Sequence, residues 1–338
     1  MSSADCLEHL GALVACDTQN PPRSIDGDSP IFAYCRKVVD SSFDVRTWDH
    51  GDGHVSWYAV RGKPSLLFNV HLDTVPVGEG WSSDPHRLRV EDSRAYGRGA
   101  CDIKGAAAAL LTLAAQGAEN LALLFTSDEE GAGGCCVARF LESGEAERYE
   151  QVVVAEPTSC LAVLGHRGYL SVKTWFEGTP GHSSEARALQ ENANHQMARW
   201  ASRALALAES RKSSPRDPGS CLNIGRIEGG TKSNVIAGRA YVHWSARLMP
   251  GDSNEAFLSD IKACADEAAK VNWEVPFRGE PLPAAGRDDS VARAWCASRR
   301  LEVGGPVDFW TEASLFSAAG LPAVVLGPGH IAPVSYTH

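Results

Sequence analysis

SLLFNVHLDTVP, residues 65–76, contains a short apolar run rich in strand-forming residues. The run predicts a buried strand, and His71 and Asp73 follow at its carboxyl end. In an open α/β sheet, ligands bind at that end of the strands. Because the side chains of a strand alternate, His71 and Asp73 share one side, where the carboxylate can orient a ring whose other nitrogen faces a metal. A surface histidine near a turn is the alternative that this motif alone leaves open.

The composition excludes several classes of function. The chain has 338 residues, of which 43% are hydrophobic and 22% charged, and this is typical of a globular protein with room for two domains. The net charge of −10 and the lack of a Lys/Arg block argue against nucleic acid and anionic membranes as partners. No apolar run is long enough to span a membrane, and the amino terminus lacks the pattern of a signal peptide. We therefore expect a small-molecule substrate.

The ten cysteines are scattered along the chain without a CxxC pair. This pattern favours thiols in a reducing cytoplasm over a secreted disulfide scaffold. The adjacent Cys135 and Cys136 do not have the spacing of a zinc knuckle. We expect a cytoplasmic protein.

Predicted strands and helices alternate in the first half of the chain, which indicates an α/β sheet covered by helices. An amphipathic first helix carries Leu7, Leu10, Leu13 and Val14 on one face. From about Gly168 the pattern changes to an inserted α+β unit, and after about Phe277 the α/β pattern returns. We expect a discontinuous main domain, residues 1–167 and 278–338, with a lid of residues 168–277. The expected strands are 43–48, 54–60, 66–71, 121–126, 151–155, 169–176, 221–227, 237–247 and 323–326, and the expected later helices are 106–115, 185–209, 254–270 and 288–299.

Four short segments with acidic or imidazole side chains follow a predicted strand or precede a helix. Singly, each has a structural explanation: a helix cap for Asp102, a solvated pair for Glu129 and Glu130, a surface residue for Glu156. Parallel strands bring their carboxyl ends to one edge, however, and clustered carboxylates without basic partners favour a cation. Histidine and carboxylates without cysteine suit zinc, cobalt or manganese. The four segments contain His71 with Asp73, Asp102, Glu129 with Glu130, and Glu156.

Seven motifs then carry a resemblance to a known family over nearly the whole chain. They are NVHLDTVP, GRGACDIKG, FTSDEEG, VVAEPT, GTPGHSS, GGTKSNVI and WTEASLFSAAGLPAVVLGPG. Together they resemble the di-zinc deacylases and exopeptidases that include acetylornithine deacetylase, succinyl-diaminopimelate desuccinylase, aminoacylase and carboxypeptidase G. The resemblance implies a zinc-exopeptidase-like three-layer αβα catalytic domain, a ferredoxin-like lid that pairs two subunits in a homodimer, and metal-dependent amide hydrolysis without a covalent intermediate.

The resemblance also implies a ligand set for two divalent metal ions, zinc or cobalt. His71 and Glu156 would bind one ion, Asp102 would bridge both, and Glu130 would bind the second. Glu129 would be the general base that takes a proton from water and passes it to the leaving amine.

Further roles follow from the same resemblance. Asp73 would orient His71, and His182 in the lid would help to hold the oxyanion. Asn234 and Arg247 would bind the α-carboxylate of the substrate, for which the planar guanidinium is suited. A histidine packed in the lid and an ordinary salt bridge are the alternatives for His182 and Arg247.

Within the family, DTQNPPR, ACDIKGAAAAL and VDFWTEASLFSAAG resemble most closely the acetylornithine and acetylcitrulline deacetylases of arginine synthesis. The expected substrate is therefore an N-acyl amino acid that loses acetate. Succinyl-diaminopimelate desuccinylases and related aminoacylases or carboxypeptidases are the alternatives. Glu312 would read the polar or cationic end of the substrate side chain, or else be a surface acid next to a helix cap.

The last residues depart from the family pattern. Members carry a histidine soon after GPG as the last ligand of the second metal, and Ser335 stands there in this sequence. A truncated or frame-shifted ending is the favoured explanation, while substitution by His330 or His338, or function with one metal, are the others. We expect an enzyme whose second metal site is weak or empty, and the alternative is a catalytically impaired homologue that binds metal or amino acid without turnover. Glu129 argues against that alternative, because it is the expected general base and only catalysis needs it.

Overall fold

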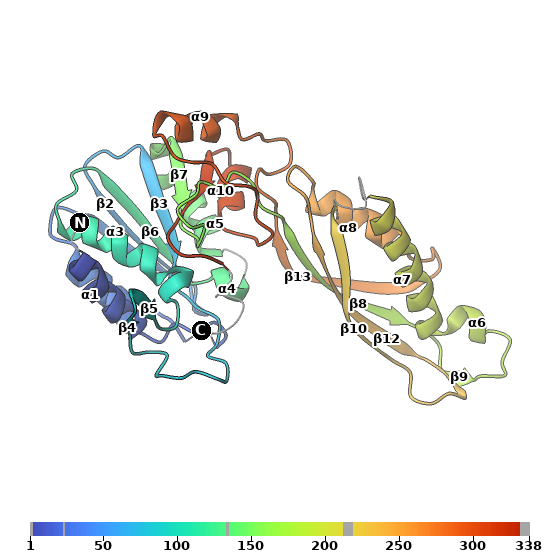
Figure 1. Ribbon diagram of the computed structural model, residues 1–338. Helices are drawn as coiled ribbons and strands as arrows, with labels where there is room; N and C mark the ends of the chain where they lie inside the picture. Colours follow the sequence, from blue (N-terminus) through green and yellow to red (C-terminus); the bar gives the residue numbers. More distant parts are fainter. Residues whose placement is uncertain (1–2, 23, 133–134, 212–218, 332–338) are drawn as a thin grey trace. The chain divides into compact units, whose positions relative to one another are not determined.

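The computed structural model describes residues 3–22, 24–132, 135–211 and 219–331. The chain forms two compact units, shown in Figure 1. Unit 1 comprises Met1–Leu164, Arg287–Pro306 and Thr311–His338, and unit 2 comprises Gly165–Gly286 and Val307–Trp310. Within the described ranges, no helix is long and apolar enough to cross a membrane.

Unit 1 is built on a six-stranded sheet with the order β1-β2-β6-β3-β7-β14. Strands β3, β6, β7 and β14 are parallel, and β2 and β1 continue the sheet antiparallel. Every residue of β6 is buried, because helices cover both faces of the sheet. The strands are β1 (Asp44–Asp49), β2 (Val55–Arg61), β3 (Leu66–His71), β6 (Leu121–Thr126), β7 (Gln151–Val154) and β14 (Ala323–Val325), with a separate hairpin of β4 (Arg89–Glu91) and β5 (Arg94–Tyr96).

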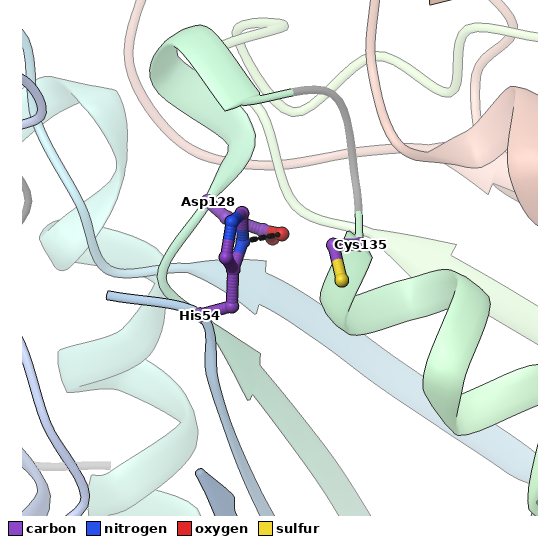
Figure 2. Close-up of side chains that lie close together, drawn as sticks. All are labelled: His54, Asp128 and Cys135. Atoms are coloured by element: carbon purple, nitrogen blue, oxygen red, sulfur yellow. Dashed lines mark hydrogen bonds and ion pairs between the residues drawn. The ribbon is translucent and has the colours of Figure 1, made fainter. Parts of the chain in front are cut away.

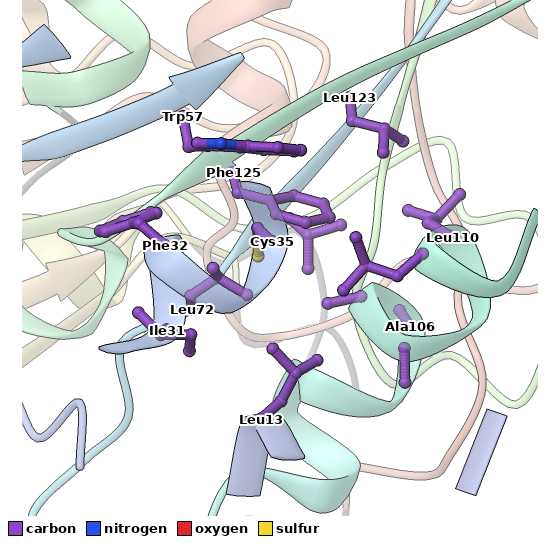
Figure 3. Close-up of a cluster of buried hydrophobic side chains, with 14 of the residues drawn as sticks. Leu13, Ile31, Phe32, Cys35, Trp57, Leu72, Ala106, Leu110, Leu123 and Phe125 are labelled. Carbon is purple, nitrogen blue, oxygen red and sulfur yellow. The ribbon is translucent and has the colours of Figure 1, made fainter. Parts of the chain in front are cut away.

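Neighbouring residues of β2 show the two helical layers. Trp57 stacks on Phe125 within the cluster formed with α1, α2 and α3, part of which Figure 3 draws. Tyr58, which points to the opposite face, contacts Phe140 of α5. These layers confirm the three-layer α/β architecture. The helical segments are α1 (Ser3–Val14), α2 (Pro30–Val38), η1 (Ala100–Lys104), α3 (Gly105–Ala115), α4 (Glu129–Ala132), α5 (Cys135–Glu142), η2 (Glu145–Arg148), α9 (Ser290–Ser298) and α10 (Ala313–Ala318).

Unit 2 holds a four-stranded antiparallel sheet with the order β10-β12-β8-β13. The connection βαββαβ in this order is ferredoxin-like. Helices α7 and α8 supply one side of a core that contains Phe176, Trp200 and Trp244. The elements are β8 (Tyr169–Glu177), α6 (Ala188–Glu191), α7 (Ala193–Ser210), β10 (Cys221–Gly229), β12 (Arg239–Arg247), α8 (Asn254–Ala263) and β13 (Lys270–Gly279), with a small ribbon of β9 (Gly181–His182) and β11 (Val235–Ile236).

Three expectations about the elements are wrong. The helix expected over 254–270 ends at Ala263, and Lys270 begins β13, an edge strand whose exposure alternates residue by residue. The helix expected over 185–209 is divided at Asn192, whose side chain accepts a hydrogen bond from the N–H of Asn194 and caps α7. Leu7 is 37% exposed, so that the buried face of α1 starts only at Leu10.

Candidate metal centre

The carboxyl ends of β3, β6 and β7 lie at one edge of the sheet. His71 ends β3 and lies beside Thr126, which ends β6. Glu129 and Glu130 follow β6, and Glu156 follows β7. Because the strands are parallel, all of these side chains start from the same edge, as the strand pattern predicts.

The tightest group at this edge consists of one imidazole and two carboxylates. His71 Nε2 lies 3.1 Å from Asp102 Oδ1 and 3.8 Å from Glu156 Oε1. The potential ligand atoms of these three residues all lie within 4.8 Å of one another. His71 and Glu156 are buried, and the Asp102 side chain is 17% exposed. This donor set matches the nitrogen and oxygen ligands of zinc and related divalent ions.

The turn that carries Asp102 depends on Gly99. Its φ of 77° is left-handed, and a Cβ there would lie 2.8 Å from Thr74 and 3.0 Å from Lys104. The glycine therefore lets the chain turn into η1 and bring Asp102 to the strand end. Lys104 itself is buried and donates to the carbonyl of Cys16 rather than to the acidic group.

Asp73 lies behind the imidazole and is fully buried. The Nδ1–H of His71 donates to the Asp73 carbonyl oxygen over 3.0 Å, and Asp73 Oδ1 lies 3.4 Å from the same nitrogen. Oδ2 accepts from Asn20 Nδ2 and from the N–H of Glu130, each over 2.9 Å. Burial opposes ionisation, but the hydrogen bonds from His71, Asn20 and Glu130 lower the pKa of Asp73. The carboxylate therefore orients the ring and leaves Nε2 directed at Asp102.

The remaining acids at the edge crowd one another. Burial raises the pKa of Glu129 well above its ordinary value, with Glu130 and Glu156 adding to the effect against the opposing His71. Burial and the nearby Asp102 raise the pKa of Glu130 to about 7. The pKa of Glu156 is likewise raised well above its ordinary value, first by burial. A bound cation would offset this repulsion, so the residues present fit a metal centre.

Glu312 contacts β3 and β6 near the same edge of the sheet. Its side chain is 1% exposed, which excludes the alternative of a surface acid. Oε2 accepts from Asn69 Nδ2 and Thr126 Oγ1, each over 3.0 Å, while Oε1 is buried without a hydrogen bond to any described residue. Burial and the nearby Asp128 raise the pKa of Glu312 to about 8. Its expected contact with substrate stays a prediction.

In unit 2, two of the three expected site residues lie together. His182 in β9 pairs with Val235 in β11, and the N–H of Ser183 donates to the carbonyl of Asn234 over 3.1 Å. Strand β12 begins at Arg239, soon after this ribbon, and ends at Arg247. Arg247 therefore lies about 27 Å along the strand from Arg239. There its guanidinium stacks over the ring of Tyr169, 4.1 Å from the centroid.

Of the residues discussed for the last ligand position, His330 is described. It forms an isolated bridge with Thr158, two residues after Glu156, and its carbonyl accepts from Cys101 Sγ over 3.4 Å. Its backbone is therefore next to the neighbours of two expected ligands. Ser335 and His338 lie outside the described residues.

Motif reasoning missed several residues. Asn20 donates a hydrogen bond to Asp73, and Asn69 donates one to Glu312. No spacing in the sequence connects either asparagine with its acceptor. A second group of potential metal ligands consists of His54, Asp128 and Cys135 (Figure 2). Asp128 lies in the motif FTSDEEG but was given no role there, and the other two residues lie outside the quoted motifs. Only the fold brings these three residues together.

The sequence model of the family described as Peptidase family M20/M25/M40 matches residues 67–338. The chain is 46% identical to an N-acetyl-L-citrulline deacetylase of Xanthomonas campestris pv. campestris, over 97% of this chain and 91% of the relative. It is 30% identical to an acetylornithine deacetylase of Vibrio campbellii, over 80% of this chain and 75% of the relative. A solved dinuclear metal-binding peptidase of Bacillus subtilis shares the fold, with a TM-score of 0.62, 13% identity and coverage of 97% and 90% of the two chains. The motifs and the fold thus agree, and the chain belongs to peptidase family M20/M25/M40.

Proposed function

We propose that the chain is a metal-dependent amidohydrolase that releases acetate from an N-acetyl amino acid in arginine synthesis. N-acetyl-L-citrulline is the first candidate substrate, because the relative named N-acetyl-L-citrulline deacetylase is 46% identical to the chain. N-acetylornithine is the second, because the relative named acetylornithine deacetylase is 30% identical. The observation that carries the proposal is the buried group of His71, Asp102 and Glu156 at the edge where three parallel strands end.

The proposed centre holds two divalent ions, zinc or cobalt. His71 and Glu156 would hold one ion, Glu130 the other, and Asp102 both. When bound, such ions polarise an amide carbonyl and lower the pKa of water. The proposal is supported by the donor set and by the crowding that raises the pKa values of Glu130 and Glu156.

Glu129 is proposed as the general base. Its carboxylate takes a proton from the attacking water and passes it to the nitrogen of the leaving amine as the C–N bond breaks, which leaves acetate and the free amino acid. Burial raises the pKa of the Glu129 carboxyl above its ordinary value, and this is the direction that makes the carboxylate a stronger base. Asp73 keeps His71 in one orientation throughout and takes no part in the proton transfer.

We assign the catalytic role to unit 1 and the role of lid to unit 2. Arg247 would bind the α-carboxylate of the substrate, and Glu312 would act on the end of the side chain. His182 would contact the oxyanion, and Asn234 would contact the α-carboxylate of the substrate. Both residues are exposed at the same small ribbon, so one ribbon would supply both contacts.

A homodimer paired through unit 2 is part of the proposal. Strand β10 is at an edge of its sheet, and Ile227 in it is 54% exposed. A groove of about 930 Å³ next to it is lined by residues that include Arg226, Gly230 and Tyr241. A long exposed edge strand invites pairing with another chain, and a second copy would cover it.

A cytoplasmic location is proposed as well. All ten cysteines are present as thiols, including the exposed Cys160. Thiols persist in a reducing compartment, whereas an oxidising one favours disulfides.

The test uses the full chain, stripped of metal and reloaded with zinc or cobalt. Metal content is measured together with acetate release from N-acetylcitrulline and N-acetylornithine, and succinate release from succinyl-diaminopimelate. We expect acetate release, fastest with N-acetylcitrulline, and loss of release in Glu129→Gln at unchanged metal content. A loaded chain that releases neither acetate nor succinate contradicts the proposed hydrolysis, and release of succinate alone would replace the substrate class.

A further inference from the structure

Three residues from distant parts of the sequence form a second donor cluster in unit 1. His54 precedes β2, Asp128 follows β6, and Cys135 begins α5 (Figure 2). His54 Nδ1 lies 2.8 Å from Asp128 Oδ2, and the potential ligand atoms of all three residues lie within 4.8 Å of one another. None of them has a role in the proposed hydrolysis.

The carboxylate of Asp128 is only half satisfied by the protein. Its side chain is fully buried, and Oδ2 interacts with His54 and accepts from the N–H of Cys136 over 2.9 Å. Oδ1 has no hydrogen bond to any described residue. A buried carboxylate oxygen without a partner is costly, and such an atom in a native protein indicates an ion or a water. Figure 2 shows the carboxylate end of Asp128 pointing toward Cys135.

The chemistry of the cluster selects the ligand. A thiolate, an imidazole and a carboxylate are three of the ligand types that zinc takes in proteins, with bond lengths of about 2.0–2.3 Å. In a tetrahedral site two such ligand atoms are about 3.3–3.6 Å apart, and the atoms of the cluster, all within 4.8 Å of one another, are close enough to reach this arrangement. The thiol distinguishes this group from the one around His71, which has only nitrogen and oxygen donors.

We propose that His54, Asp128 and Cys135 form a separate site for a divalent cation that accepts thiolate, with zinc as the natural occupant. Cys135 also interacts with the exposed Arg139, which donates a hydrogen bond to Glu142 over 2.9 Å. Arg139 can keep its bond to Glu142 when the sulfur of Cys135 binds the ion. The ion would tie the start of β2 to the end of β6 and the start of α5.

Cobalt provides a test that does not depend on activity. A cysteine thiolate bound to Co²⁺ gives a sulfur-to-metal charge-transfer band in the near ultraviolet, and carboxylates and imidazole alone do not. We expect this band when the metal-stripped full chain is titrated with Co²⁺. Cys135→Ser should abolish the band and lower the bound cobalt by one ion per chain, while acetate release persists. Cys101→Ser and Cys160→Ser, which change thiols outside the cluster, should keep the band.

A second variant protects the test against loss of fold. His54→Gln keeps the thiol but removes the imidazole, and it should weaken the cobalt affinity read from the band by at least tenfold. Circular dichroism and the melting temperature of the metal-free variants check that each is folded. A wild-type chain that binds cobalt without the band, or a Cys135→Ser variant that retains it, overturns the site. Neither result bears on acetate release, so the proposed function is tested separately.

Discussion

The backbone N–H of Glu130 donates to Oδ2 of Asp73 over 2.9 Å. The N–H of Glu129 lies 3.3 Å from the other oxygen of the same carboxylate. One buried side chain at the end of β3 therefore positions both the imidazole of His71 and the two glutamates that follow β6.

Replacing Asp73 with Asn should weaken metal binding and catalysis together. The amide keeps the shape of the side chain but removes the charge that faces His71, and partners of this kind are worth about 10–100-fold in metal affinity or activity. Metal content after dialysis and kcat/KM for N-acetylcitrulline measure the effect. Asp84→Asn, the same change in an exposed turn, is the control. Wild-type values for Asp73→Asn would mean that His71 is held by its other contacts.

The adjacent glutamates offer a matched pair of variants. Glu129→Gln should reduce kcat by about 10²–10⁴-fold without loss of metal, because it removes only the proton transfer. Glu130→Gln should lose one of the two ions of the centre, because it removes a ligand. Metal analysis and acetate release on the same preparations separate the two roles. An exchange of the two outcomes would reverse the assignment of base and ligand.

The edge of the sheet that carries the centre was predictable because strand ends can be recognised locally. The apolar run before His71 and the one before Glu129 each identify a strand, and parallel pairing then brings the two ends together. The surroundings of Glu312 could not be predicted in this way. Its partners Asn69 and Thr126 lie on β3 and β6, far from Glu312 in the sequence, and no pattern in the sequence shows that the side chain is buried.

The strand β13 shows a different limit. ACADEAAK, residues 263–270, consists largely of good helix formers, which is why the helix was expected to continue. In the structure, Asp266 instead pairs with Arg199 and Arg203 of α7, beyond the end of α8. The cluster of His54, Asp128 and Cys135 was missed for the related reason that its members share no spacing, and only the folded sheet brings them together.

The buried Glu312 should make the stability of the metal-free chain depend on pH. Its pKa is raised from 4.5 to about 8 in the folded state, so between these values the unfolded chain releases the proton first. The free energy of unfolding contributed by Glu312 is therefore fully present below pH 4.5 and is lost as the pH rises toward 8, with a slope of up to about 1.4 kcal/mol per pH unit.

Glu312→Gln tests this slope. The amide oxygen can still accept from Asn69 and Thr126, while the charge is removed. Urea unfolding of both metal-free proteins between pH 5 and 8 measures their free energies of unfolding. The free energy of unfolding of the variant, relative to that of wild type, should increase as the pH rises. Parallel curves for the two proteins would show that Glu312 is ionised in the folded chain throughout this range.

His330 is the described histidine nearest in sequence to the expected position of the last ligand. Its bridge to Thr158 and the contact of its carbonyl with Cys101 put its backbone beside residues that flank Glu156 and Asp102. His330→Ala should therefore remove one of the two ions of the centre and reduce acetate release. His338→Ala, which removes the other histidine near the end of the sequence, is the control and should have no such effect. Full metal content in His330→Ala would exclude it as a ligand. Ser335→His would then be the decisive variant, because a gain in second-ion affinity and acetate release would show that position 335 is where this ligand belongs.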